Sequence, residues 1–397
     1  MELIEATLKC RYAILKIASR CNLNCSYCYV YNKGDKSYLL QPKKMSTETI
    51  DAFISKTKEH CTLHKSKAFT FIFHGGEPLL AGKEFFEYFV EKVVVNFRDI
   101  DTEARFTIQT NGVLLNEEWC ELFNRLRIRI GISIDGPKNY NDINRVDHSN
   151  RGSFDNIIKG INVVKNYGKI PLGILSVVNI EIPPQEMYSF LKELDVAWMN
   201  FLLPDGNYDN PPEGLGLNYS ETIYADWLIS LFDMWFEDNS NRLDIGMFRS
   251  LIYLVLGVEV AADEFGTRTT DALVIETNGD IESLDVLKIC GDGFTKGDAN
   301  VKNTSFDEAL NTPLARSYHL SHKILSEKCQ DCVVKDICGG GNLPHRFSSE
   351  NKFDNPSVYC ANLYKLIIHI QNKIISKLPE SFVKESGIKE LEYNKIK

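Results

Sequence analysis

Short apolar runs alternate with longer amphipathic stretches over the first half of the chain. Residues 46–60, 83–97, 117–126 and 153–167 carry apolar positions at helical spacing, and Ser46 offers an N-cap for the first of these stretches. Strands that alternate with helices are typical of βα units, whose strands pair in parallel. The pattern predicts an α/β fold with a partial barrel of six strands. These strands are expected at residues 12–18, 68–74, 105–110, 129–135, 171–178 and 198–203.

Proline and glycine interrupt this pattern between residues 181 and 216, which indicates a boundary near residue 205. Beyond it, residues 219–237 and 247–256 are expected to form amphipathic helices with Trp227 and Phe232 in the core. Two apolar runs, 272–276 and 281–287, flank an Asn-Gly pair and predict a hairpin. We expect four parts: a barrel over 1–205, a helical linker over 206–265, a cysteine-rich domain over 266–380 and a C-terminal tail over 381–397.

Composition narrows the class of protein. The 397 residues include 45 basic and 54 acidic side chains, a net charge of −9 that argues against nucleic acid as a partner. No signal peptide and no long uncharged apolar run is present, so we expect a cytoplasmic protein without a membrane partner. The 11 cysteines are clustered, which in a reducing compartment favours metal ligands over disulfides.

The first cysteine group follows the first predicted strand directly. Cys21, Cys25 and Cys28 have the spacing C-x3-C-x2-C. Three thiolates on one loop hold three corners of a four-iron cube and leave the fourth iron open to a ligand that is not protein. Zinc is the alternative, but it favours four closed ligands in C-x2-C pairs, and no fourth ligand lies nearby.

Polar turns follow the next three predicted strands. His74-Gly75-Gly76-Glu77 ends the second, and Ser133 ends the fourth, with Arg145 downstream. Paired glycines let the backbone approach a ligand, and a carboxylate beside them can accept bonds from an ammonium group. Because the carboxyl ends of parallel strands meet at one edge, these turns are expected to surround one ligand.

The second cysteine group lies near the C-terminus. Cys329, Cys332, Cys338 and Cys360 supply four thiols within about thirty residues, enough to saturate an iron–sulfur cluster or a zinc ion. Spacing alone leaves these two possibilities equally open.

The order of the N-terminal motifs resembles the radical S-adenosylmethionine (SAM) enzymes, in the peptide-modifying branch that includes sulfatase-maturating enzymes. The resemblance implies a partial (β/α)6 TIM-like barrel and a 4Fe-4S cluster on Cys21, Cys25 and Cys28 that binds SAM and cleaves it to a 5′-deoxyadenosyl radical. It also implies which residues contact SAM: Tyr27, His74, Gly75, Gly76, Glu77, Ser133 and Arg145.

The C-terminal cysteines, together with Gly339-Gly340-Gly341 and the preceding hairpin, resemble the SPASM extension of radical SAM peptide maturases. That resemblance implies an auxiliary 4Fe-4S cluster on Cys329, Cys332, Cys338 and Cys360. Fuller SPASM sequences have further cysteine ligands where this chain has Leu284 and Asn342. We therefore expect two clusters in total, and plain thiols at Cys10, Cys61, Cys120 and Cys290.

The run Asn355-Pro356-Ser357-Val358-Tyr359 before Cys360, with His345 and Arg346, resembles cyclophane-forming maturases. These join an aromatic ring carbon to the β-carbon of a nearby residue in a ribosomally made precursor peptide. The implied partners are that peptide and an electron donor such as flavodoxin or ferredoxin. Thioether formation and sulfatase-type formylglycine formation are the alternatives, and a zinc-binding module without redox chemistry is a remote one.

The base that the reaction requires is expected to be Asp285. By resemblance to sulfatase-type maturases, this aspartate matches one assigned as a base. Glu282 and Asp292 are acidic neighbours that could serve instead, and the alternative for Asp285 is a solvent-facing position on the hairpin edge.

Overall fold

Parallel strands form the centre of the N-terminal half in the computed structural model, which describes residues 7–216, 219–239 and 242–393. Here β1 (Tyr12–Ala18), β2 (Ala68–Gly75), β3 (Glu103–Thr110) and β4 (Ile128–Ser133) pair in that order, all parallel. On the other side of β1 lies β8 (Ala272–Ile275), also parallel, and β9 (Ile281–Glu282) is antiparallel to β8. The predicted α/β class with a parallel sheet is confirmed.

The contacts divide the chain into two compact units that are both discontinuous in sequence. One unit holds the residues up to 134 together with 141–174 and 271–319. The other holds 135–140, 175–270 and the residues from 320 onward. The first cysteine group lies in the first unit and the second group in the second unit.

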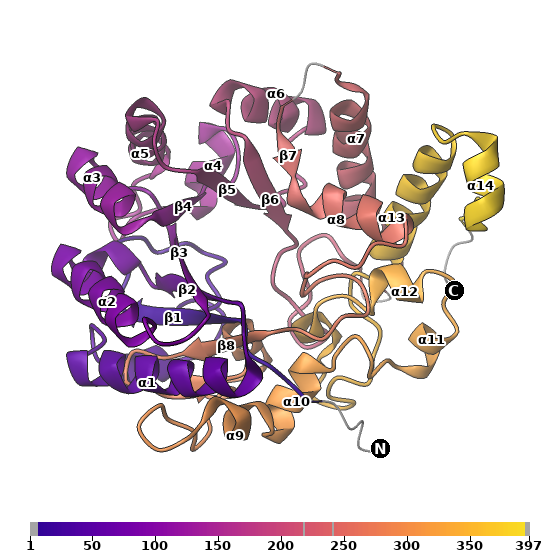
Figure 1. Ribbon diagram of the computed structural model, residues 1–397. Coiled ribbons are helices and arrows are strands. Elements are labelled where there is room, and N and C mark those ends of the chain that lie inside the picture. The colour runs from indigo at the N-terminus through magenta and orange to yellow at the C-terminus, as the bar shows by residue number, and fades with distance from the viewer. Residues whose placement is uncertain (1–6, 217–218, 240–241, 394–397) are drawn as a thin grey trace. The chain divides into compact units, whose positions relative to one another are not determined.

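Helices of the first unit connect consecutive strands, as βα units require. Figure 1 shows α1 (Thr47–His64), α2 (Lys83–Asn96) and α3 (Glu117–Leu126) along one side of β1 to β4. The Ser46 side chain accepts a hydrogen bond from the Thr49 N–H, so the predicted N-cap of α1 is confirmed. The remaining helical segments of this unit are η1 (Ser37–Leu40), η2 (Pro78–Ala81), α5 (Phe154–Tyr167), η3 (Asp285–Cys290), α9 (Phe306–Leu310) and α10 (Pro313–His319).

Strand β2 illustrates how the sheet separates its two faces. Phe69, Phe71 and Phe73 alternate along it and are fully buried, and the rings of Phe71 and Phe73 pack edge to face on Phe89 of α2. Side chains of a strand point alternately to opposite faces, so His74 lies on the other face. Its partner in register on β1 is Lys16. The two side chains therefore share the face of the sheet that is turned away from the phenylalanine core.

The second unit contains β6 (Trp198–Leu202), which is parallel to the two-residue strand β7 (Asp244–Ile245), while β5 (Leu172–Val177) runs from the first unit into the second. Trp227 and Phe232 of α7 are buried, which confirms their predicted core position. Asn362 of α13 accepts a bond from the Ala225 N–H of α7, 3.0 Å away. The helices of this unit are α6 (Pro184–Leu194), α7 (Ile223–Glu237), α8 (Gly246–Val255), α11 (Glu327–Gln330), α12 (Lys335–Cys338), η4 (Leu343–Arg346), α13 (Cys360–Ile375) and α14 (Glu380–Ser386). Helix α4 (Lys138–Asn144) begins in residues of the second unit and ends in residues of the first.

The predicted second hairpin strand over residues 281–287 is wrong beyond Glu282. The chain turns there into η3 (Asp285–Cys290), in which Asp285 and Lys288 are both buried. Buried charges need partners, and Asp285 pairs with Lys16 while Lys288 pairs with Glu276 and Glu282. Asp285 consequently does not lie exposed on a hairpin edge, which excludes the solvent-facing alternative.

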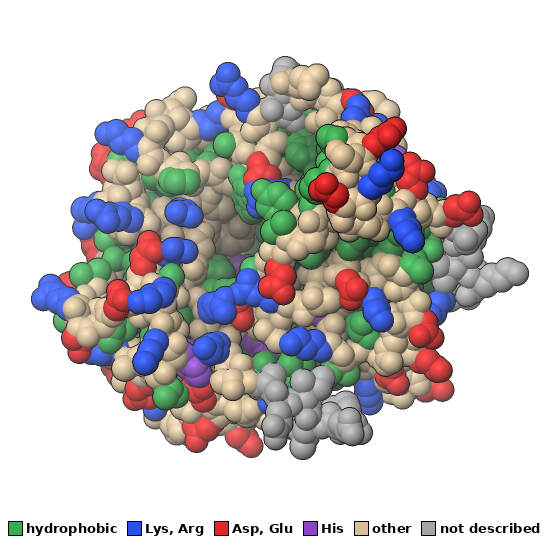
Figure 2. All heavy atoms as spheres, turned by 45° about the vertical axis from the view of Figure 1, so that its right-hand side comes forward, with side chains coloured by type: hydrophobic (Ala, Val, Ile, Leu, Met, Phe, Trp, Pro, Cys, Tyr) green, Lys and Arg blue, Asp and Glu red, His purple; other side chains and the backbone are tan. Residues whose placement is uncertain are grey.

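The surface charge and the length of the helices bear on possible partners. On the face in Figure 2, basic and acidic side chains are interspersed over the surface. Among the described residues, every helix is too short or too polar to cross a bilayer.

Candidate active site

The loop after β1 holds Cys21, Cys25 and Cys28, which are half-buried and form no disulfide among the described residues. Backbone bonds fix the loop against the segment after α4, since the Asn24 N–H donates to the Val146 carbonyl (2.7 Å). Burial, and then the Glu77 carboxylate, raise the pKa of Cys21 to about 12, and burial also raises that of Cys28. Such thiols become thiolates when a bound metal stabilises them, so this donor set fits an iron–sulfur cluster.

The Gly75-Gly76 turn packs directly against the residues that precede Cys21. The Gly76 N–H donates to the Ala18 carbonyl (2.8 Å) and the Glu77 N–H to the Arg20 carbonyl (3.0 Å). A Cβ on Gly75 would collide with the Ala18 carbonyl oxygen, and one on Gly76 with the Tyr31 hydroxyl. Within the chain, the paired glycines therefore bring the end of β2 onto the cysteine loop.

Glu77 is fully buried, and three protein donors already bind its carboxylate. It accepts from the Thr110 hydroxyl (2.7 Å), the Asn111 N–H (2.9 Å) and the Leu79 N–H (3.0 Å). A carboxylate has about four acceptor positions, so about one remains for the amino group of a ligand. The chain uses Glu77 chiefly to tie the ends of β2 and β3 together.

The other predicted SAM contacts are also held by hydrogen bonds in the first unit. An Arg145 guanidinium N–H donates to the Tyr27 hydroxyl over 2.7 Å. Ser133 at the end of β4 accepts a bond from the Gln109 side chain of β3, 2.8 Å away. The structure thus brings Tyr27 and Arg145 together and ties Ser133 to its neighbouring strand.

A buried polar centre joins Asp285 to residues of β1, β2 and the cysteine loop. Lys16 forms an ion pair with Asp285, and both side chains are at most 4% exposed. The Tyr29 hydroxyl donates to the same Asp285 oxygen (2.5 Å) and accepts from the Lys16 ammonium (3.1 Å). Lys16 also donates to Nδ1 of His74, 3.2 Å away.

The charges of this centre follow from its contacts. Burial alone would raise the pKa of Asp285, but Lys16 and the hydrogen bonds hold it well below its usual range. Burial, and then the Lys16 charge, lower the pKa of His74 to about 3, so the imidazole is neutral. Nδ1 of His74 also accepts from the Gly75 N–H (2.8 Å), which leaves the proton on Nε2. The centre therefore holds an ionised carboxylate, an ammonium and a neutral imidazole.

Sequence reasoning missed Lys16 and Tyr29 as members of this centre. A lysine inside the apolar run 12–18 was a usable signal, because a buried ammonium requires an anionic partner. The identity of that partner, far along the chain, was not readable from spacing.

The second cysteine group surrounds a cavity of about 240 Å³ in the second unit, lined by all four thiols. Burial raises the pKa of Cys338 and Cys360 to about 12, and for each thiol another cysteine of the group adds to the effect. Four converging free thiols around one cavity fit a 4Fe-4S cluster held by Cys329, Cys332, Cys338 and Cys360.

The two positions expected to lack cluster ligands lie in different units, and Leu284 is buried while Asn342 is half-buried. Leu284 is 5% exposed and precedes η3 in the first unit. Asn342 precedes η4 in the second unit, and its side-chain oxygen is buried without a hydrogen-bond partner among the described residues. Cys10, Cys61 and Cys120 are buried free thiols, and Cys290 is half-buried.

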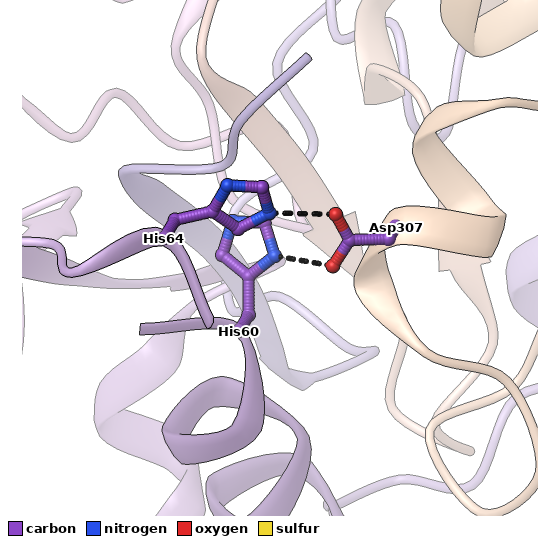
Figure 3. A group of neighbouring side chains, drawn as sticks. All are labelled: His60, His64 and Asp307. Atoms are coloured by element: carbon purple, nitrogen blue, oxygen red, sulfur yellow. Dashed lines mark hydrogen bonds and ion pairs between the residues drawn. The ribbon is translucent and has the colours of Figure 1, made fainter. Parts of the chain in front are cut away.

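His60 and His64 of α1 converge on Asp307 of α9, as Figure 3 shows. Nδ1 of His60 lies 2.9 Å from one carboxylate oxygen, and Nε2 of His64 lies 2.6 Å from the other. Nε2 of His60 accepts a bond from the Cys10 N–H (3.0 Å), so its proton is on Nδ1. A metal ion would need the lone pair of that Nδ1, and the group is therefore a hydrogen-bonded bracket, not a metal centre.

Comparison with known proteins identifies the class. Residues 15–194 match the model of the Radical SAM superfamily. The match covers the cysteine loop after β1 and strands β2 to β5, so this part of the chain has the fold of the Radical SAM superfamily.

Several curated proteins that are similar to this chain along most of its length are anaerobic sulfatase-maturating enzymes. The cysteine-type anaerobic sulfatase-maturating enzyme of Clostridium novyi is 27% identical over 373 residues, 91% of this chain and 94% of the relative. The corresponding enzyme of Clostridium perfringens strain 13 is 29% identical, over 86% of this chain and 91% of the relative. The serine-type enzyme of Bacteroides thetaiotaomicron is 28% identical, over 90% and 89%.

Solved structures agree with this relationship. Native anSMEcpe with bound AdoMet has a TM-score of 0.78 and 25% identity, over 92% of this chain and 99% of that chain. The same protein with AdoMet and the Cp18Cys peptide has a TM-score of 0.76 and 26% identity, over 93% and 99%. The chain thus resembles sulfatase-maturating enzymes along nearly its whole length.

Proposed function

We propose that this chain is a radical SAM enzyme that oxidises the β-carbon of a cysteine or serine side chain in a peptide or protein, as a sulfatase-type maturase. The observation that carries the proposal is the near-full-length similarity to sulfatase-maturating enzymes, including a structure with bound peptide. Cys21, Cys25 and Cys28 would hold the SAM-binding cluster. That cluster supplies the reductive cleavage of SAM to a 5′-deoxyadenosyl radical when it is loaded.

The chain's own residues handle the proton and the geometry. Oxidation of a C–H bond to an aldehyde or thioaldehyde removes one hydrogen atom, one further electron and one proton from the substrate. Asp285 is ionised and can accept that proton, and the Tyr29 hydroxyl that donates to it can relay the proton. Tyr27 and Arg145, joined by their hydrogen bond, would bind SAM beside the cysteine loop.

Cyclophane formation is the second candidate, favoured by one specific observation. Leu284 and Asn342 stand where fuller SPASM sequences, including sulfatase-type maturases, carry cluster ligands. Joining a β-carbon to an aromatic ring also removes two hydrogens from the peptide, and Asp285 would then accept the ring proton. The two candidates share the first step at the β-carbon and differ in what captures the carbon radical.

Three peptides separate the candidates. Anaerobically reconstituted enzyme with SAM and a strong reductant is given a peptide with a sulfatase-type cysteine site, its serine counterpart, or a peptide with an aromatic residue two positions before an aliphatic one. Products are followed by mass spectrometry, by capture of aldehydes with a hydrazide and by 5′-deoxyadenosine release. We expect an aldehyde in the cysteine or serine peptide.

The alternative outcomes are distinct. Loss of two hydrogens from the aromatic peptide, without hydrazide capture, would replace the first candidate by the second. Release of 5′-deoxyadenosine with every peptide unchanged would contradict both. The matched control replaces Cys21, Cys25 and Cys28 together by Ala, which should abolish 5′-deoxyadenosine release, and persistent release would contradict the assignment of these ligands.

A further inference from the structure

A buried arginine, Arg346, binds the backbone that directly follows Cys338 of the second cysteine group. Arg346 of η4 is 1% exposed and is among the largest fully buried side chains. Its five N–H groups all donate to backbone carbonyl oxygens, at 2.7–3.1 Å. The acceptors are Gly339, Gly340, Gly341, Ser321 and Ile324.

The glycine run after Cys338 is shaped by this guanidinium. Gly339, Gly340 and Gly341 have φ values of 59°, 79° and 69°, a left-handed conformation that side chains with a Cβ rarely adopt in succession. A Cβ on Gly340 would meet the guanidinium itself. The run thus directs three consecutive carbonyl oxygens at Arg346, while its own chain continues from the ligand Cys338.

The positive charge of Arg346 is not neutralised by a carboxylate. Carbonyl oxygens satisfy its hydrogen bonds but carry no net charge, and no acidic side chain pairs with it among the described residues. Burial lowers the pKa of the guanidinium, and the thiolates of Cys329 and Cys338 act against that effect. Burial of an unpaired cation is costly. The negative charges that act on Arg346 are the thiolates of Cys329 and Cys338.

We propose that Arg346 sets the reduction potential of the auxiliary cluster by placing a desolvated positive charge beside Cys329 and Cys338. A cube on four thiolates carries a net charge of about −2, or about −3 after it accepts one electron. A nearby cation stabilises the more negative state, and the effect is strong in a medium of low dielectric constant. Arg346 therefore raises the potential and makes the cluster a better electron acceptor. The inference rests on the proposed ligand set.

The test measures the potential, not turnover. The chain in which Cys21, Cys25 and Cys28 are replaced by Ala is expected to retain only the auxiliary cluster, whose midpoint potential is read by electron paramagnetic resonance during redox titration. Arg346→Gln, which keeps a hydrogen-bond donor and loses the charge, is expected to shift the potential to a more negative value. Arg346→Lys keeps the charge and should remain near the parent.

A matched control separates burial from charge alone. Lys335 lines the cavity and is exposed, so water screens its charge, and Lys335→Gln should shift the potential much less than Arg346→Gln. An Arg346→Gln potential equal to that of the parent, or a Lys335→Gln shift of the same size, would overturn the proposal. Loss of auxiliary iron in both Arg346→Lys and Arg346→Gln would overturn the proposal. It would mean that Arg346 serves only to hold the Gly339–Gly341 backbone in place. None of these measurements depends on the peptide substrate, so the proposed function can fail independently.

Discussion

The Lys16–Asp285 pair is the residue-scale feature that most changes the interpretation of the site. A base at position 285 could be expected from the sequence, but its buried ammonium partner could not. In the folded protein the carboxylate is already paired and hydrogen-bonded. Its replacement therefore has two effects, one on proton transfer and one on a buried charge that loses its partner.

Asp285→Asn is expected to destabilise the protein by about 3–5 kcal/mol, because Lys16 is left as an unpaired buried charge. The double variant Lys16→Met with Asp285→Asn should recover most of that loss, since it removes both charges. Thermal unfolding of the parent, the two single variants and the double variant gives the coupling between the residues. If the losses in free energy of unfolding of the two single variants simply add in the double variant, Lys16 and Asp285 do not interact, which would contradict the ion pair.

The same variants separate fold from chemistry. If the double variant folds, holds its iron and releases 5′-deoxyadenosine but forms no product, the carboxylate is required for the later proton transfer. Product formation at the parent rate would assign the base to another group or to water.

Glu282 titrates near neutral pH in the folded protein. Burial, and then the Glu276 carboxylate, raise its pKa to about 7 from 4.5, while Lys288 opposes this. Folded protein therefore binds more protons than unfolded protein between these values, so stability falls as pH rises through that window. We expect a loss of about 2–3 kcal/mol from this group.

Glu282→Gln should flatten that dependence. Thermal midpoints of parent and variant, measured between about pH 5 and pH 8, should diverge as the pH rises, with the variant more stable at the alkaline end. Glu308→Gln is the control, because that carboxyl is exposed and its pKa is lowered instead. Parallel curves for parent and Glu282→Gln would contradict the buried titration.

At the scale of elements, most strands and helices of the first half were readable from apolar spacing, because each βα unit buries one face locally. The second hairpin strand was not, because the chain turns into η3, where Asp285 and Lys288 pair with Lys16 of β1, Glu282 of β9 and Glu276, which directly follows β8. The two-residue strand β7 carries no periodicity of its own. An element whose position depends on ion pairs between residues far apart in the sequence cannot be predicted from the local pattern of apolar residues.

The bracket between α1 and α9 gives a prediction for these elements. Asp307→Ala removes an acceptor from both His60 and His64, and should lower the free energy of unfolding by about 2–4 kcal/mol. Addition of Zn²⁺ should leave the thermal midpoint of the cluster-loaded parent unchanged, because the proton of His60 lies on Nδ1 and the clusters occupy the cysteine groups. Asp298→Ala, at an exposed acidic position, is the control. A Zn²⁺-dependent rise that vanishes in Asp307→Ala would instead establish a metal site.

For the whole molecule, the number of clusters tests the expected departures from the SPASM cysteine pattern. Seven thiols in two groups are predicted to hold two cubes, or about eight irons per chain. About twelve irons after anaerobic reconstitution would mean that the departures at Leu284 and Asn342 do not remove a cluster. Cys360→Ala should lower the iron content toward one cube and stop product formation.

One feature of the sheet affects how the protein is made. Strand β8 pairs with β1, although about 260 residues separate them in the chain. At about 5–20 residues per second, a ribosome that has completed β1 needs roughly 10–50 s more before β8 emerges. During that interval the free edge of β1 is available for wrong pairing, and the cysteine loop that follows it is already outside the ribosome. Holding chaperones and the timing of iron delivery are therefore expected to determine how much enzyme a cell obtains.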